Sequence, residues 1–546
     1  MRIYGVLVYL IYKKDMSNFK KVFSNTFWQV LSRFIQALIG VVSLKLLTEI
    51  FPADVYGQYV TLFEYIGFFA IAADFGLYTV CISEMSKNTK EKDEIFANLL
   101  FLRVVLTVFI LGFASFITPK IGIYENTLIA KGIYIVSLMT GITLLSGTLS
   151  SVLQFELKMH KAALAQLFSK VVYIFGVIYL WKISLEGSDI NKFDFLLDLN
   201  LLSSLVLLFF TFVYVRKYIS FSFKVSKKYS LNLIKKALPY GIAIMLNKFY
   251  FKIDVLMIQA MKGNFEAATY SIPIKIMEIL NLIPVFFMNS CLPFLGKTFK
   301  NSKEKFQNII KGSFKSLFIV VCPVLMCGYF LAYPLTASLS NTQFLSGYHC
   351  VNDARQIFQQ EELAIQECQK VAKGEFAIEK NSNSYVYYEG SDFAFKIILF
   401  ALFFAFLNVV FNYYLLASDN QRTLLKFNFT ALGLNVVLNY LFIPIYGFMA
   451  ASLVTVVCEA LILFLGLNYY LKNHKLNIGA EFYLKIAGLS LFLGFLCKYL
   501  YEFTFVYLKN FNLLLIIPVI VAMYFGLIYK LKITNLNDLK NYFKTS

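Results

Sequence analysis

The stretch "NKFYFKIDVLMIQAM", Asn247–Met261, is apolar enough to enter a membrane, yet it carries two lysines and an aspartate in its middle. A lone charge at the centre of a bilayer costs roughly 2.5–3.5 kcal/mol on insertion scales, so such residues normally face a bundle interior or a watery cavity. The stretch therefore predicts a membrane helix that is surrounded by other helices of the same protein.

The composition of the whole chain agrees with a membrane protein. Of its 546 residues 59% are hydrophobic, and the mean hydropathy of +0.66 exceeds what a water-soluble domain hides in a core. The formal net charge of +19 has to be judged by where the lysines lie, because basic residues also gather in cytoplasmic loops. We therefore expect an all-α integral membrane protein that binds no nucleic acid.

Counting apolar segments of about 20 residues predicts fourteen membrane spans. With the amino end inside, the cytoplasmic segments hold 31 of the 51 lysines and arginines and the opposite loops hold 8, as the positive-inside rule requires. Both termini are then cytoplasmic. The predicted spans are 24–50, 56–84, 95–118, 128–155, 161–183, 195–215, 235–261, 266–296, 314–336, 394–416, 424–445, 448–471, 480–501 and 511–530.

An internal repeat predicts how the spans are grouped. The turn "FPADVYGQY" near Tyr59 and the turn "KGNFEAATYS" near Tyr270 each join a helix end to a small residue and a tyrosine that open the next helix. Two six-helix lobes and a carboxyl-terminal helix pair follow from this repeat. The predicted parts are a cytoplasmic segment 1–23, a lobe 24–215, a basic linker 216–234, a lobe 235–471 with an outer insertion 337–393, a pair 480–530 and a cytoplasmic tail 531–546.

Three motifs in this order resemble one known family. They are "FPADVYGQY...ADFGL" (Phe51–Leu77), "IDVLMIQAMKGNFEAATYS" (Ile253–Ser271) and "NYLFIPIYGFMAASLVTVVCE" (Asn439–Glu459). The pattern is similar to that of Wzx-type oligosaccharide flippases of the MOP superfamily, which also contains MATE exporters and MurJ lipid II flippases. The resemblance implies alternating access in the bacterial cytoplasmic membrane, with an undecaprenyl-pyrophosphate-linked glycan as cargo. Membrane lipids, and a polysaccharide polymerase with its chain-length machinery, are the other partners it suggests.

Basic residues inside the spans are the candidate contacts for a pyrophosphate head group, since ammonium and guanidinium donors replace lost hydration. Lys248 and Lys252 share one helix face, and Arg33 lies in the equivalent helix of the other lobe. Pairing with acids inside the membrane is the alternative explanation. The full set of candidates is Arg33, Arg103, Lys170, Lys248, Lys252 and Lys275.

Four acids inside the spans are candidates for binding a proton or a sodium ion that drives transport: Asp74, Asp254, Glu278 and Glu459. Structural ion pairs are the competing explanation for each of them. Asp254 follows Lys252 by two residues, so the two side chains should point to different neighbours.

The sequence supports neither an enzyme nor a cofactor. Three scattered histidines and no Cys/His cluster give no metal site and no catalytic array. In the outer insertion, apolar residues within 351–371 recur at helical spacing, and Cys350 and Cys368 form a disulfide only if that helix is broken. Two other functions remain open: a MATE-like ion-coupled antiporter for small molecules, which should have an acid-rich cavity, and a membrane-embedded sugar polymerase or glycosyltransferase.

Overall fold

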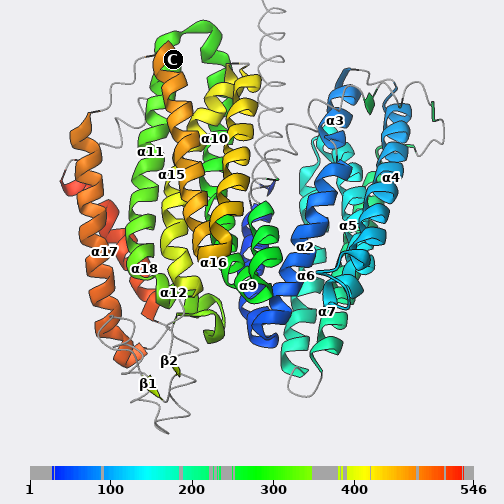
Figure 1. The fold of residues 1–546 in the computed structure, drawn as a ribbon. Helices are drawn as coiled ribbons and strands as arrows, with labels where there is room; N and C mark the ends of the chain where they lie inside the picture. The colour runs from blue at the N-terminus through cyan, green and yellow to red at the C-terminus, as the bar shows by residue number, and fades with distance from the viewer. Residues whose placement is uncertain are drawn as a thin grey trace, which may run out of the picture. The chain divides into compact units, whose positions relative to one another are not determined.

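The computed structural model is built almost wholly of α-helices (Figure 1). It describes residues 28–29, 31–74, 76–87, 91–183, 188–220, 225–226, 230, 233–234, 249, 252–346, 379–380, 383–384, 390–418, 420–474, 479–508, 512–531 and 533. Two compact units divide the chain: unit 1 holds Met1–Phe51 and Gln58–Lys252, and unit 2 holds Pro52–Gly57 and Ile253–Ser546. The division falls inside the charged stretch described first, between Lys252 and Ile253.

Unit 1 begins with a helix at Leu31–Ile50. Its other elements are most of α2 (Ala53–Asp74), α3 (Leu77–Lys87), α4 (Lys92–Ile117), the 3-10 turn η2 (Thr118–Lys120), α5 (Leu128–Phe155), α6 (Met159–Ile183) and α7 (Asp189–Val215). Helix α5 packs against α3, α4 and α7, while α6 lies against α7. The approach of α6 to α7 is close at Gly176, where a Cβ atom would lie 2.2 Å from a methyl group of Leu199.

The predicted second span is interrupted inside unit 1. Helix α2 ends at Asp74, Gly76 takes a positive φ of 71°, and α3 begins at Leu77. Only glycine adopts that backbone conformation without steric cost. The interruption places the carboxylate of Asp74 and the carbonyl of Ala73 where other helices of the unit can reach them.

Besides Pro52–Gly57, unit 2 holds most of a helix over residues 252–262, from Ile253 on. It continues with α9 (Asn264–Leu280), α10 (Leu282–Asn301), α11 (Lys303–Phe330), α12 (Ala332–Leu339), the 3-10 turn η3 (Thr342–Phe344), a short β1–β2 hairpin (Glu379–Lys380 and Asn383–Ser384), α15 (Ser391–Ala417), α16 (Gln421–Asn473), α17 (Ala480–Leu508) and α18 (Asn512–Lys530). The most buried of these helices is α15, which contacts α9, α10, α11, α12 and α16. Helix α17 packs on α11, and α18 packs on α17.

Helix α16 is two membrane helices joined at a sharp turn. Gly447 has φ 56° and ψ −140°, and Pro444 lies just before it. Beyond the turn, a carboxylate oxygen of Glu266 accepts a hydrogen bond from the backbone N–H of Phe448 at 2.9 Å, which satisfies a donor that the second helix leaves open. The turn lies between the predicted spans 424–445 and 448–471.

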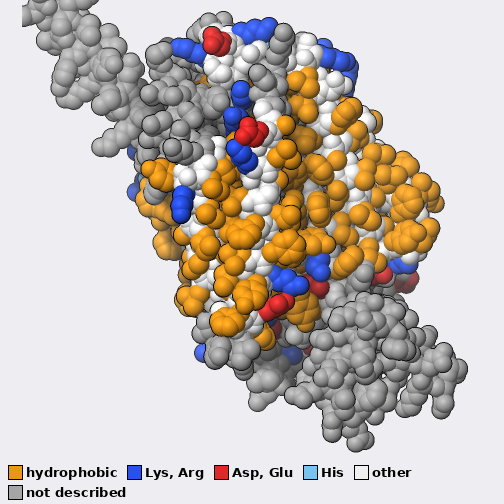
Figure 2. All heavy atoms as spheres, turned by 90° about the vertical axis from the view of Figure 1, so that its left-hand side faces the viewer, with side chains coloured by type: hydrophobic (Ala, Val, Ile, Leu, Met, Phe, Trp, Pro, Cys, Tyr) orange, Lys and Arg blue, Asp and Glu red, His pale blue; other side chains and the backbone are white. Residues whose placement is uncertain are grey.

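Within the described residues, eleven helices are long and apolar enough to cross a membrane, with α16 counted as one. The predicted total of fourteen spans stays a prediction, because α2 and α3 are interrupted and residues 235–248 lie outside the described part of the chain. Figure 2 shows the face that includes α17 and α18: apolar side chains cover its middle, and charged ones are sparse there. Large apolar side chains on these helices are exposed, for example Leu484, Leu514 and Tyr529. A multi-pass membrane protein has such a surface, because lipid covers it.

Candidate functional site

Lys252 forms an ion pair with Glu64 of α2 inside unit 1. The side chain of Glu64 is 9% exposed and that of Lys252 is 27% exposed. Burial of this degree makes each charge depend on its partner, because water is largely excluded from both. A candidate phosphate contact is thus held by a carboxylate from a neighbouring helix.

Arg103 is the most completely enclosed of the predicted basic residues, with 1% of its side chain exposed. Its guanidinium donates to Asp74 at 2.6 Å, to Thr148 at 2.7 Å and to the backbone carbonyl of Ala73 at 3.0 Å. These bonds tie α4 to the break after α2 and to α5. The arrangement is that of a structural ion pair, the alternative that the sequence left open for Arg103 and Asp74.

Arg33 and Lys170 lie on two helices of unit 1 that are joined by a side-chain hydrogen bond. The amide of Gln36 donates to Gln166 of α6 at 3.0 Å. Arg33 is exposed one turn before Gln36, and Lys170 follows Gln166 by one turn. The ammonium of Lys170 lies 5.3 Å from the ring centroid of Tyr173, within cation–π range. In the described part of the chain neither basic residue has an ion-pair partner, so both remain available to an anion.

The remaining two basic candidates are Lys275 and Lys248. Lys275 of α9 pairs with Glu278 one turn along at 3.2 Å, and the two side chains are 39% and 46% exposed. An exposed pair of this kind contributes little energy. Lys248 lies outside the described residues.

Asp254 lies at the centre of a buried polar cluster in unit 2. It accepts hydrogen bonds from Tyr270 of α9 at 2.9 Å and from two residues of α16, Asn439 at 2.8 Å and Thr455 at 3.1 Å. The carboxylate is 4% exposed, and no lysine or arginine of the described residues pairs with it. Asp254 therefore has partners quite distinct from those of Lys252, although the two are only two residues apart.

The cluster around Asp254 presents mainly oxygen atoms. Asn439 also donates to the amide oxygen of Asn435 at 3.2 Å. The Thr455 hydroxyl, which has a single proton, also lies 2.9 Å from the carbonyl oxygen of Ala451. The amide oxygen of Asn439 is buried, and among the described residues it has no hydrogen-bond partner. Carboxylate, amide, hydroxyl and carbonyl oxygens are the donors that hard cations prefer. A buried carboxylate without a cationic neighbour is suited to hold a proton or a small metal ion.

Glu459, the remaining acidic candidate, is bound to α15. Its carboxylate accepts a hydrogen bond from the amide of Asn408 at 2.6 Å, and the side chain of Asn408 also donates to the backbone carbonyl of Glu459 at 2.9 Å. Glu459 is 3% exposed. These bonds join α15 to the second half of α16.

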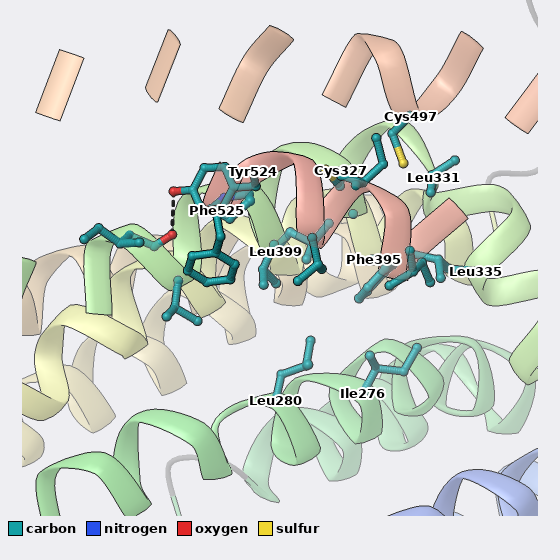
Figure 3. Close-up of a pocket in the computed structure, with 18 of the residues that line it drawn as sticks. Ile276, Leu280, Cys327, Leu331, Leu335, Phe395, Leu399, Cys497, Tyr524 and Phe525 are labelled. Atoms are coloured by element: carbon teal, nitrogen blue, oxygen red, sulfur yellow. Dashed lines mark hydrogen bonds between the residues drawn. The ribbon is translucent and has the colours of Figure 1, made fainter. Parts of the chain in front are cut away.

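An apolar cavity of about 430 Å³ lies inside unit 2. Figure 3 shows Ile276 and Leu280 of α9 opposite Phe395 and Leu399 of α15, with Phe525 of α18 beside them. Residues of α11, α12 and α17 complete its wall. The volume lies within the range of small-molecule sites, and the lining suits a hydrocarbon chain.

Sequence reasoning missed Glu64 and the partners of Asp254. Glu64 is one of three acids in the predicted span 56–84, with Asp74 and Glu84, and that signal was available in the sequence. Asn435 and Asn439 are one helical turn apart, and Thr455 lies beyond the turn at Gly447. Asn and Thr are common in membrane helices, so these residues did not stand out in the sequence. Only the packing of α16 onto α9 and residues 252–262 reveals that they surround one carboxylate.

Both ends of the predicted insertion 337–393 lie within the described residues. Asp392 accepts hydrogen bonds from the backbone and hydroxyl of Ser346, both at 2.8 Å, and that hydroxyl accepts one from the backbone of Gly390 at 2.7 Å. Cys350, Cys368 and the predicted helical stripe within 351–371 lie outside the described residues.

Comparison with known proteins gives a family and a fold. A family model described as "Polysaccharide biosynthesis protein" matches residues 22–299. No curated protein sequence matches the chain.

The solved structures include a lipid II flippase MurJ in an inward closed conformation, which is 15% identical with a TM-score of 0.67 and covers 94% of this chain and 100% of its own. A multidrug resistance MATE transporter of the MOP superfamily is 13% identical with a TM-score of 0.60, covering 81% of this chain and 96% of its own. A MOP superfamily transporter from Pyrococcus furiosus is 14% identical with a TM-score of 0.53, covering 83% and 97%. The fold is that of MurJ and the MATE transporters.

Proposed function

The chain belongs to the family of polysaccharide biosynthesis proteins, and from that premise we propose that it is a flippase for lipid-linked oligosaccharides. Its cargo is an undecaprenyl-pyrophosphate-linked repeat unit, which it moves from the cytoplasmic to the outer leaflet of the bacterial cytoplasmic membrane by alternating access. The product supplies surface polysaccharide assembly. Both termini of the chain are cytoplasmic in this proposal.

The apolar cavity of unit 2 is the observation that carries the proposal. Its wall includes α17 and α18, the carboxyl-terminal pair. The MurJ structure covers 94% of this chain, against 81% and 83% for the two MATE-like structures. A carrier of small water-soluble molecules has no use for an apolar cavity of this size, whereas a polyprenyl-linked cargo has a long apolar tail. The cavity is where we place part of that tail.

The head group requires cations, and unit 1 provides them. A pyrophosphate carries about two negative charges and loses water on entering the membrane, so lysine and arginine donors have to replace that hydration. Arg33 and Lys170 have no ion-pair partner in the described part of the chain, and Lys252 is held by one exchangeable carboxylate. We assign these three side chains to the head group. Arg103 supports the fold of the unit.

Asp254 is the proposed coupling site. The hydroxyl of Thr455 and the amide group of Asn439 both contact its carboxylate inside unit 2, and the amide oxygen of Asn439 has no hydrogen-bond partner among the described residues. Binding of a sodium ion or a proton there neutralises a buried negative charge, which changes how α9, α16 and residues 252–262 hold together. A change of packing in these helices links the ion to the transport cycle.

The direct test is deletion of the gene followed by location of the undecaprenyl-linked repeat unit. The proposal expects the unit to accumulate on the cytoplasmic leaflet, and expects wild-type protein to restore export. The variants Arg33→Ala, Lys170→Ala and Lys252→Ala should restore much less export at equal protein level. Normal export by all three would remove the assigned head-group site.

A further inference from the structure

The helix Leu31–Ile50 exposes apolar side chains along one face. Phe34, Leu38 and Val42 recur at steps of four residues, which keeps side chains on one face of a helix. Their side chains are between 47% and 59% exposed. Because this helix is long and apolar enough to cross a membrane, we expect lipid to cover this face.

The same helix has a polar face on its other side. Arg33, Gln36 and Gly40 are three and four residues apart, and at about 100° per residue they lie roughly opposite the apolar face. Arg33 and Gly40 are exposed and Gln36 is half-buried. A Cβ atom added to Gly40 would meet no atom of the described residues within 4 Å. Charged and amide side chains are costly against lipid, so this polar face borders open space that can admit water or cargo.

On this polar face Gln36 forms an amide bridge to Gln166 of α6, within unit 1. The amide nitrogen of Gln36 donates to the amide oxygen of Gln166 at 3.0 Å and to the hydroxyl oxygen of Ser32 at 2.8 Å, which accounts for both of its hydrogens. The amide oxygen of Gln36 and the amide nitrogen of Gln166 make no hydrogen bond to any other described residue. The amide bridge therefore leaves one acceptor and one donor close together.

A basic residue lies one turn from the amide bridge on each of its two helices. Arg33 precedes Gln36 by three residues, and Lys170 follows Gln166 by four. One helical turn rises about 5.4 Å, a distance comparable to the width of a sugar ring. If Arg33 and Lys170 hold a pyrophosphate, the sugar that is joined directly to that pyrophosphate reaches the amide bridge.

We propose that the amide bridge binds the sugar next to the pyrophosphate and selects a sugar that carries an acetamido group. The inference rests on the flippase function proposed above and adds a sugar subsite to it. An acetamido group presents one C=O acceptor and one N–H donor, which match the remaining nitrogen of Gln166 and the remaining oxygen of Gln36. A hydroxyl group offers a single oxygen for both contacts and satisfies the two amides less well. A site built to hydrogen-bond one group discriminates against an analogue that leaves its polar atoms unpaired.

The test compares two lipids that differ at one position of the sugar. Purified full-length protein in nanodiscs is titrated with undecaprenyl-pyrophosphoryl N-acetylglucosamine and, separately, with undecaprenyl-pyrophosphoryl glucose, and bound lipid is counted by native mass spectrometry. We expect wild type to bind the acetamido lipid about tenfold more tightly, as one additional hydrogen bond allows. Gln166→Met keeps an unbranched stem but removes the donor, so most of this preference should be lost.

A purely structural bridge gives a different result. If the bond between Gln36 and Gln166 only holds the two helices together, its loss weakens the binding of both lipids alike and leaves the ratio of their affinities unchanged. Gln36→Met removes the acceptor from the other helix and serves as the second variant if Gln166→Met does not fold. Gln307→Met is the matched control, because that glutamine bonds to His474 of unit 2 at 3.2 Å, and its ratio should equal that of wild type.

Two results would overturn the sugar subsite. One is a wild-type protein that binds both lipids equally, and the other is a folded Gln166→Met or Gln36→Met protein whose ratio matches that of wild type. A wild-type protein that binds neither lipid removes the flippase function itself. Failure of the subsite and failure of the proposed function are therefore distinguishable.

Discussion

Replacement of Arg103 by methionine tests the separation between structural and substrate-binding cations. Methionine keeps much of the apolar stem and suits a helix, but it removes three donor bonds and leaves Asp74 without its counter-charge. Removing one partner of a buried ion pair costs about 3–5 kcal/mol. At roughly 2 °C per kcal/mol for a unit of this size, the melting temperature should fall by about 6–10 °C.

Thermal unfolding of the detergent-purified protein, followed by size-exclusion fluorescence, measures the effect. Arg33→Met is the control in the same unit, because Arg33 is exposed and its loss should leave the melting temperature nearly unchanged. The double variant Arg103→Met with Asp74→Asn removes both charges and should regain part of the lost stability. An Arg103→Met protein as stable as wild type that no longer binds cargo would refute the reasoning, because Arg103 would then act on substrate.

Three further predictions address other parts of the chain. Asp254→Asn turns an acceptor of three hydrogen bonds into a side chain with its own donors, so it should lower the free energy of unfolding by roughly 1–3 kcal/mol. It should also abolish the dependence of transport on a sodium or proton gradient. Gradient-driven transport that persists in the variant would argue against a coupling site. Lys275→Gln removes an exposed i,i+3 pair worth about 0.3–0.5 kcal/mol, so melting and export should stay at wild-type levels, and lost export in a folded variant would return Lys275 to the head-group site. Gly57→Ala places a Cβ atom 2.0 Å from the backbone oxygen of Asn264 within unit 2, so the melting temperature should fall, and an unchanged value would show that these two backbones lie farther apart.

The positions of many membrane helices could be predicted from the sequence, because the thickness of the hydrocarbon layer sets how many consecutive apolar residues a span needs. Helices α5 and α6 begin and end within a few residues of the predicted spans. Helix α7 ends where it was predicted to end but begins one turn or more earlier, at Asp189. That turn is capped by Ser188, whose hydroxyl accepts from the backbone of Asn191 at 3.4 Å. A polar cap adds helix beyond the apolar stretch, and hydropathy alone does not detect it.

Charge partners were less predictable than spans. The sequence indicated that basic residues inside the membrane need a cavity or a carboxylate, yet it gave no means of choosing between them. Arg103 and Asp74 are 29 residues apart, and Lys252 and Glu64 are 188 residues apart. Such pairs are decided by which helix faces meet, and that depends on packing across the whole unit.

The cluster around Asp254 shows the same limit from the acidic side. The groups that donate hydrogen bonds to Asp254 come from α9 and from both halves of α16, so no sequence pattern near Asp254 predicts them. The turn at Gly447 brings the two halves of α16 together. A proline followed closely by a glycine marks such a turn in the sequence, but the direction in which the second helix returns is a property of the fold.

Transport by the purified protein in liposomes is the most direct test of the central claim. Fluorescently labelled undecaprenyl-pyrophosphate oligosaccharide is incorporated, and a membrane-impermeant reductant destroys the label in the outer leaflet. The account predicts that liposomes with the protein lose the protected inner-leaflet signal at a measurable rate, and that Lys252→Ala slows this loss. A signal that stays as protected as in protein-free liposomes, with correctly folded protein present, would contradict it.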